Sequence, residues 1–214
     1  MSEREPANPE RIVLEGGHVR LEPLRVAHVS ALVAAASEDR STYGFTYVPD
    51  GLAATEAYVA SAVVDREAGR AVPFATIDRS SGRVVGTTRF ANFGYYAWEG
   101  DSPHQRGDHL PDEVEIGWTW LAASAQRTPI NTEAKLLMLG QAFESWRVHV
   151  VRLKTDARNK RSWNAILRLG AEHDGVLRAA QPASDGAMRD TAYFSIVDAQ
   201  WPSVRDGLQA KLGR

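Results

Sequence analysis

The stretch EVEIGWTWLAASAQRTPINTEAKLLMLG, residues 113–140, decides the fold of this chain. Its first part, Val114–Leu121, alternates strictly between apolar and polar residues, which predicts a half-buried strand. Alternate side chains of a strand point to opposite faces. One face should carry Val114, Ile116, Trp118 and Trp120, and the other Glu113, Glu115, Gly117 and Thr119. A polar connection over 122–130 leads into a helix predicted over Asn131–Trp146, which is apolar on more than one side and therefore buried.

This stretch belongs to a longer strand–helix–strand–helix run, from 113 to 169. The run continues with a strand over Val148–Thr155 and a helix over Asn159–Leu169, which Gly170 ends. Upstream, the patterns predict a strand over Val19–Leu24, a helix over Ala27–Asp39, a loop over Tyr43–Leu52, a helix over Ala53–Ala68, a hairpin of Val72–Asp78 with Arg83–Asn92, and an irregular insert, Phe93–Pro111. Downstream, they predict strands over Val176–Arg178 and Asp190–Val197 and a helix over Asp198–Leu212. Elements mixed in this order indicate an α/β or α+β domain built on one mixed sheet.

Composition limits the classes of protein to consider. The chain has 214 residues, of which 43% are hydrophobic and 24% are charged, as in an average soluble domain. The absence of cysteine excludes disulfides, thiolate zinc sites and cysteine nucleophiles, and it fits a reducing, cytoplasmic location. The net charge is −2 with no long basic run, so nucleic acid is not an expected partner.

No apolar stretch is long enough to span a bilayer, so no membrane association is expected. Residues 1–11, MSEREPANPER, are polar and lack the apolar centre of a signal peptide. We therefore expect a disordered tail over 1–11 and a single domain over 12–214.

The connection between the predicted strand and helix is a candidate anion site. Free backbone N–H groups converge at a helix N-terminus, and the helix dipole adds partial positive charge there. Arg127, within this connection, supplies a full positive charge. An ordinary strand–helix connection explains the same residues, so physical reasoning alone leaves both interpretations open.

Four sequence segments resemble one family. They are EIGWTWL (115–121), AQRTPINTEAKLLML (125–139), LKTDARNKRSWNAILRLGA (153–171) and RDTAYFSI (189–196). They resemble the GNAT acetyltransferases, in the branch of the ribosomal-protein alanine N-acetyltransferases (RimJ/RimL-like). The resemblance implies a mixed, mostly antiparallel sheet of six or seven strands flanked by helices. It also implies that Val114–Leu121 and Val150–Thr155 splay apart to admit acetyl-CoA.

The resemblance assigns CoA binding to the loop after the first of these strands. The family pattern Gln/Arg-x-x-Gly-x-Gly/Ala falls on residues 126–131. Its residues here, with the helix residue that follows, are Gln126, Arg127, Thr128, Pro129, Ile130, Asn131 and Thr132. Pro129 and Asn131 replace the two small residues of the pattern. Proline removes one N–H donor, and Asn131 suits a helix start, where we expect its side chain to cap.

Asn159 and Ser162 lie three residues apart at a helix start and therefore share a face. Capping is the local explanation for both residue types. The resemblance implies instead that Asn159 binds the pantetheine arm and that Ser162 protonates the leaving thiolate. Ile166 and Leu167 occupy the region where many GNAT enzymes carry a tyrosine acid.

Acylation of an amine requires removal of a proton, and a carboxylate can accept it. Glu115 matches the Glu of the family's EIG motif, so it is the candidate for the catalytic base or for a residue that positions the amine, and Glu113 on the same face is its competitor. A solvated carboxylate or a structural ion pair is the alternative for Glu115. By resemblance, backbone N–H near Trp118 polarises the thioester carbonyl.

Three aromatic residues of the insert, Tyr95, Tyr96 and Trp98, are candidates for a substrate or dimer contact, with partial burial as the alternative. The histidines show no metal-ligand spacing, and His104 and His109 are expected to be solvated, so no metal is expected.

The sequence thus predicts transfer of acetyl from acetyl-CoA to a primary amine, on a protein N-terminus or a small molecule. A catalytically silent acyl-CoA-binding module is the alternative, and a homodimer remains open.

Overall fold

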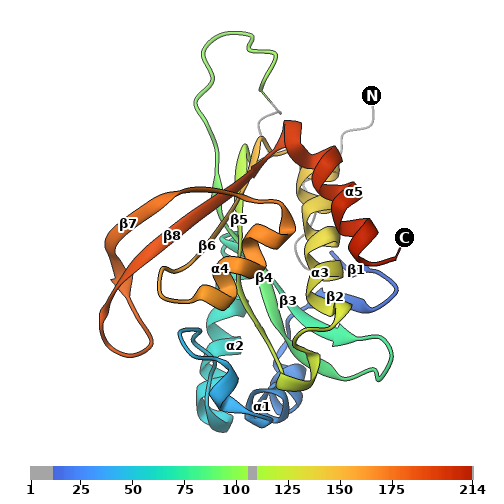
Figure 1. Ribbon diagram of the computed structural model, residues 1–214, viewed down its shortest axis with the longest axis vertical. Helices are drawn as coiled ribbons and strands as arrows, with labels where there is room; N and C mark the ends of the chain where they lie inside the picture. The colour runs from blue at the N-terminus through green and yellow to red at the C-terminus, as the bar shows by residue number, and fades with distance from the viewer. Residues whose placement is uncertain (1–11, 106–109, 214) are drawn as a thin grey trace.

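The computed structural model describes residues 12–105 and 110–213, and these form one sheet of eight strands in the order β1-β2-β3-β4-β5-β6-β8-β7 (Figure 1). The strands are β1 (Leu14–Glu15), β2 (Val19–Pro23), β3 (Ala71–Asp78), β4 (Val84–Gly94), β5 (Glu113–Leu121), β6 (Val150–Asp156), β7 (Glu172–Pro182) and β8 (Met188–Val197). All neighbours pair antiparallel except β5 and β6, which are parallel. The predicted class, a mixed and mostly antiparallel sheet flanked by helices, is confirmed, with eight strands in place of six or seven.

Helices cover both faces of the sheet (Figure 1). They are α1 (Val29–Ser37), α2 (Gly51–Glu67), α3 (Pro129–Gly140), α4 (Lys160–Leu169) and α5 (Trp201–Lys211). Tyr58 of α2 bonds Thr87 of β4, whereas Met138 of α3 contacts the next residue, Thr88. Because successive strand residues point to opposite faces, α2 and α3 lie on opposite sides of the sheet.

The two parallel strands at the centre pair over a short length only. Their register joins Glu113 with Val150, Val114 with Val151 and Glu115 with Arg152. No further pairs follow, although β5 continues to Leu121 and β6 to Asp156. The expected splay between the two strands is therefore present beyond Glu115.

A β-bulge interrupts β5 within this splay. Arg89 of β4 pairs with Gly117 and Thr87 pairs with Trp120, so two residues of β5, Trp118 and Thr119, face one residue of β4. Trp118 has a φ of +51°, in the left-handed region. The bulge changes which face each later side chain occupies.

The prediction that Trp118 shares the buried face of Val114 and Ile116 is therefore wrong. The Trp118 side chain is 42% exposed, whereas Val114 and Ile116 are buried. Beyond the bulge, Thr119 points toward α3, where its Oγ1 lies 2.7 Å from Lys135 Nζ. Trp120 points to the other side, with its ring edge-on to Tyr43.

Several predicted boundaries also shift. The helix expected from Asn131 begins at Pro129 and gives way after Gly140 to a π-helical turn, Gln141–Trp146. The short strand expected over Val176–Arg178 is the eleven-residue β7, and the sequence pattern does not predict β1. The expected C-terminal helix begins with a 3-10 turn, Asp198–Gln200, before α5. Residues 1–11, the expected tail, and His109 lie outside the described residues.

Two charged residues of α3 are buried. Glu133 accepts hydrogen bonds from the backbone N–H groups of Gly17, His18 and Val19, and this ties α3 to the start of β2. Lys135 donates from Nζ to Thr88 Oγ1 at 2.9 Å as well as to Thr119. Complete burial lowers the pKa of Lys135 to about 7.

Candidate active site

The carboxylate of Glu115 lies at the point where β5 and β6 separate. The residue is 7% exposed. Its Oε2 accepts a hydrogen bond from Asn92 Nδ2 at 2.8 Å and forms an ion pair with Lys154 Nζ at 2.9 Å. Its Oε1 faces Gly117, because a Cβ added there would lie 3.0 Å from this oxygen. Among the described residues, none donates a hydrogen bond to Oε1.

The competing carboxylate, Glu113, is held by other groups. Its Oε2 accepts hydrogen bonds from Arg152 Nε at 2.8 Å and from the Tyr96 hydroxyl at 2.9 Å. Burial raises the pKa of Tyr96, and the hydrogen bond to Glu113 adds to this effect. Glu113 also lies at the paired end of β5, one same-face position before the splay.

Two cationic side chains flank the exposed ring of Trp118. The Arg89 guanidinium carbon lies 4.9 Å from the ring centroid and Lys154 Nζ lies 5.8 Å from it. Arg89 also contacts the ring of Tyr58 and pairs with Asp65 at 3.4 Å. The bulge therefore turns Trp118 toward the polar face of the sheet, beside Glu115 and its lysine partner.

The predicted CoA loop ends in a capped helix. Thr128 is the N-cap of α3, with its side chain accepting from the Ile130 N–H, and Pro129 occupies the first helical position. Proline is favoured there because its missing N–H would have no intrahelical partner. The expectation that Asn131 caps the helix is wrong, because Asn131 lies inside the first turn.

The N–H groups without helical partners are those of the cap and the first turn. In α3 these belong to Thr128, Ile130 and Asn131, and Thr132 lies one position beyond them. Thr132 is buried, and its hydroxyl accepts a hydrogen bond from Arg168. Arg127, just before the cap, has a φ of +61° and an exposed side chain.

The side chain of Gln126 forms hydrogen bonds within the protein that hold the loop in place. Its Nε2 donates to the Leu121 carbonyl and to Thr42 Oγ1, both at 3.0 Å. Its Oε1 accepts from Arg161 of α4 at 2.7 Å. A contact of Gln126 with CoA stays a prediction, since the side-chain amide is bonded within the protein.

Asn159 caps α4, as the local explanation predicts. Its Oδ1 accepts from the Ser162 N–H at 3.0 Å, and its Nδ2 donates to Thr46 Oγ1 at 3.4 Å. Ser162 is half-buried, and its hydroxyl has no hydrogen-bond partner among the described residues. The pantetheine contact of Asn159 and the acid role of Ser162 stay predictions.

The insert aromatics lie at the opposite end of β5 from the CoA loop. Tyr95 is 62% exposed. Tyr96 reaches Glu113, whereas Trp98 donates to Asp112 at 2.9 Å and packs against His104 and His149. Figure 1 shows this segment projecting from the molecule on the side away from α1 and α2. The structure thus places Tyr96 on Glu113, the competing carboxylate, and Trp98 on Asp112.

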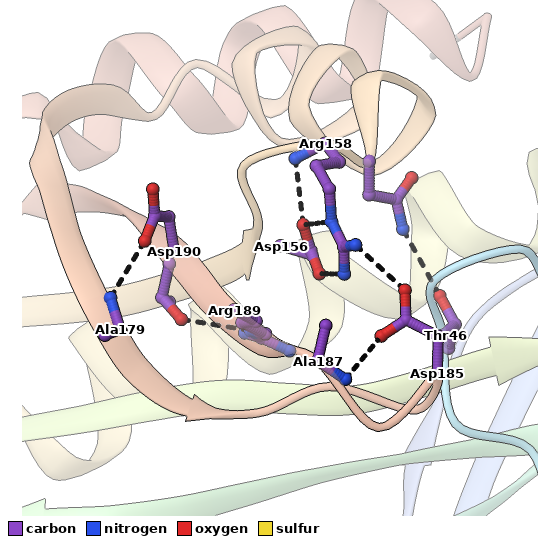
Figure 2. A network of polar contacts seen from close by, with 10 residues as sticks. Thr46, Asp156, Arg158, Ala179, Asp185, Ala187, Arg189 and Asp190 are labelled. Carbon is purple, nitrogen blue, oxygen red and sulfur yellow. Dashed lines mark hydrogen bonds and ion pairs between the residues drawn. The ribbon is translucent and has the colours of Figure 1, made fainter.

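Three segments far apart in sequence converge beside the start of α4 (Figure 2). Arg158 donates two hydrogen bonds from its guanidinium to Asp156. It donates a third, at 2.8 Å, to Asp185 at the tip of the β7–β8 hairpin. Its guanidinium also lies over the ring of Phe45, in the loop before α2. The hydrogen bond from Arg158 lowers the pKa of Asp156. This network joins the hairpin to the rest of the domain.

Sequence reasoning missed three site residues, Asn92, Lys154 and Arg89. Polar residues at 152 and 154 alternate with apolar ones in β6, so Lys154 was within reach of pattern analysis. Asn92 was not, because it reaches Glu115 from a left-handed position, with a φ of +51°, in an irregular part of β4. Within the described residues, no group of three or more potential metal ligands gathers, and no helix has the length and apolar character to cross a membrane.

This fold and site define a class. A strand pair that splays beside a capped helix N-terminus and a buried carboxylate is the arrangement that the sequence resemblance implies for an acyl-CoA-dependent acyltransferase. Residues 18–172 match the family model described as an acetyltransferase (GNAT) domain. The chain therefore belongs to the GNAT acetyltransferase family.

Solved structures agree with this assignment. A GCN5-related N-acetyltransferase from Brucella melitensis is 30% identical with a TM-score of 0.77, over 95% of this chain and 86% of that one. A putative acetyltransferase from T. thermophilus is 32% identical with a TM-score of 0.70, over 94% and 96% of the two chains. Mycobacterium smegmatis RimJ in complex with CoA-disulfide shares the fold at 21% identity, with a TM-score of 0.74, over 94% and 93%. No curated protein sequence matches the chain.

Proposed function

We propose that this acyltransferase moves the acetyl group of acetyl-CoA to a primary amine by direct attack within a ternary complex. The observation that carries the proposal is the position of Glu115 Oε1 at the splay between β5 and β6, where no described residue donates a hydrogen bond to it. An oxygen in this position can accept the amine proton, while Asn92 and Lys154 fix the carboxylate through Oε2.

Direct transfer of the acetyl group to the amine requires no nucleophilic side chain. The amine nitrogen attacks the thioester carbonyl, the C–S bond breaks, and the amine proton passes to Glu115. The departing thiolate becomes CoA thiol by taking a proton, for which the hydroxyl of Ser162, without a hydrogen-bond partner in the described part of the chain, is the candidate donor. Backbone N–H groups at the Trp118 bulge are the candidate donors to the thioester oxygen.

The α3 N-terminus supplies the candidate site for the CoA phosphates. The N–H groups of Thr128 and Asn131, the helix dipole and the exposed Arg127 favour an anion there. Pro129 fits this role, since at the first helical position its missing N–H costs no hydrogen bond. The pantetheine arm then passes toward Asn159 and Ser162 at the start of α4.

The acceptor is a primary amine on a protein N-terminus or on a small molecule. A cytoplasmic site of action, a single domain over 12–214 and a possible homodimer are parts of the same proposal. Neither a metal nor nucleic acid has a role in it. A catalytically silent acyl-CoA-binding module is the alternative, for which turnover is the deciding property.

The test is turnover of acetyl-CoA with a panel of amines. Thiol release and a mass gain of one acetyl group on the amine should appear together, and omission of either substrate should abolish both. Binding of acetyl-CoA without turnover across peptides, amino acids and polyamines would support the silent module instead.

A further inference from the structure

Arg189 lies on the same face of the sheet as the candidate base. In the register, Asp156 pairs with Thr191 and Lys154 pairs with Tyr193, so alternate residues of β6 and β8 share this face. Lys154 contacts Glu115, and Arg189 precedes Thr191 by two positions on that side. Figure 2 shows Arg189 on β8 next to the cluster of Asp156 and Arg158.

No carboxylate among the described residues pairs with Arg189. Asp156 and Asp185 are both bound by Arg158, and Glu115 is bound by Lys154. Asp190, its neighbour in the chain, accepts from the Ala179 N–H instead. Arg189 itself donates once, from Nε to Thr191 Oγ1 at 3.0 Å. This bond leaves the terminal nitrogens of the guanidinium without protein acceptors within the described part of the chain.

The surroundings of Arg189 make an unpaired guanidinium unfavourable. The side chain is half-buried, and this burial lowers its pKa, against the opposing charges of Asp156 and Glu115 nearby. Burial of a charge without a partner is costly, and it is relieved when a ligand supplies the opposite charge. The bond to Thr191 also fixes the planar group, so its free edge is set to bind a carboxylate or phosphate with two parallel hydrogen bonds.

We propose that Arg189 binds an anionic group of the acceptor, so that the preferred substrate is a small primary amine that also carries a carboxylate or a phosphate. This inference rests on the proposed acetyl transfer and specifies its acceptor. The amine then lies toward Glu115, and the anionic group lies toward β8. A neutral peptide N-terminus offers no group for this guanidinium.

Matched acceptor pairs test the proposal. β-Alanine is compared with β-alaninamide, and phosphoethanolamine with ethanolamine, with kcat/KM corrected for the fraction of neutral amine. The wild-type protein should favour the anionic member of at least one pair by about tenfold or more, the strength of a hydrogen bond to a charged group. The two pairs distinguish a carboxylate from a phosphate. Equal or greater activity on the neutral members, or on neutral peptides, would overturn the proposal.

Variants localise the effect. Arg189→Gln should lower kcat/KM about tenfold to hundredfold for the anionic amine and less than about twofold for its neutral partner. Arg205→Gln, on α5, is the matched loss of one arginine and should change neither value. The rise in Tm caused by acetyl-CoA shows that each variant is folded. An equal loss on both members of a pair would assign Arg189 a structural role and contradict the proposal.

Failure of the proposed function has a different signature. If no amine in either pair is acetylated, the transferase proposal fails, and binding decides the role of Arg189. β-Alanine and phosphoethanolamine are then titrated separately into CoA-saturated protein. Binding by wild type that Arg189→Gln abolishes would support the anion site, and no binding by wild type would overturn it.

Discussion

At the residue scale, the two oxygens of Glu115 have different partners. Oε2 is held by Asn92 and Lys154, and Oε1 faces Gly117 at the opening of the splay. Oε2 sets the orientation of the carboxylate, and in the proposed reaction Oε1, which receives no hydrogen bond from the described residues, meets the incoming amine. The ion pair with Lys154 is also the structural alternative that the sequence left open for Glu115, and the kinetics of a variant separate the two roles.

Glu115→Gln should therefore lower turnover by about 10²–10⁴ while leaving acetyl-CoA affinity unchanged. The loss should shrink as pH rises, because more of the amine is already neutral and needs no base. Steady-state kinetics across pH measure this, with Glu113→Gln as the control that should retain most activity. A loss independent of pH would mean that Glu115 positions the amine and does not take its proton.

Ser162 and Asn159 separate a chemical role from a capping role. Ser162→Ala should lower turnover by roughly tenfold. The effect is small because a thiol has a pKa of about 8.5, so the thiolate leaves readily even without a proton donor. The Tm of this variant should not change, since the cap of α4 is the side chain of Asn159. Asn159→Ala, the control, should lose about 1 kcal/mol of stability. Unchanged turnover in Ser162→Ala would remove this residue from the site.

At the element scale, β5 shows what the sequence could predict and where it failed. Alternation places Val114 and Ile116 in the core and Glu115 on the polar face, as the structure has them. Apolar and polar residues continue to alternate through Trp118, so the sequence pattern does not predict the bulge. Its cause is tertiary, because β4 pairs on both sides of the extra residue and the Thr87 hydroxyl bonds the Trp118 carbonyl.

The CoA loop gives the same result at the start of α3. Pro129 departs from the family pattern and predicts a missing donor, but the helix begins two residues earlier than expected. Proline then stands at the position where it is best tolerated, and Thr128 takes the capping role expected of Asn131. The sequence does contain a pattern typical of a helix start at this earlier position, since Thr128 is followed by Pro129. The side-chain bonds of Gln126 to Thr42 and Arg161 were not predictable, since they join segments distant in sequence.

Burial of Lys135 predicts a pH dependence of stability. In the unfolded chain this lysine holds its proton up to the ordinary lysine pKa of 10.5, whereas in the fold burial lowers the pKa to about 7. Between these values the unfolded state binds more protons, so the free energy of unfolding rises with pH by about 1.4 kcal/mol per unit. This contribution is fully present above the unfolded pKa and is lost as pH falls toward the folded pKa.

Lys135→Met should remove that slope, and Thr88 and Thr119 keep a partner because their hydroxyls also bond each other at 2.8 Å. Urea unfolding at about pH 7.5 and about pH 9.5 measures the difference, and wild type should gain roughly 2–3 kcal/mol relative to the variant. Parallel pH dependence of the two proteins would show that Lys135 keeps its proton in the folded state.

At the scale of the whole molecule, the proposed CoA site and the proposed acceptor site draw on different elements around the splay between β5 and β6. The capped start of α3 and the start of α4 carry the residues that we propose for CoA binding. The polar face carries Glu115, Lys154 and Arg189, and it is the side that we propose for the acceptor. The short pairing of β5 with β6 connects them, so the proposed reaction depends on the topology as much as on any side chain.

Binding of acetyl-CoA by the folded domain tests the central claim most directly. A ligand at 100 times its Kd adds about 2.7 kcal/mol to the free energy of unfolding, which for a domain of this size raises Tm by roughly 5–10 °C. Thermal unfolding with increasing acetyl-CoA should show this rise, and Arg127→Ala should need more ligand for the same shift. A melting curve unchanged by millimolar acetyl-CoA and CoA would contradict the account.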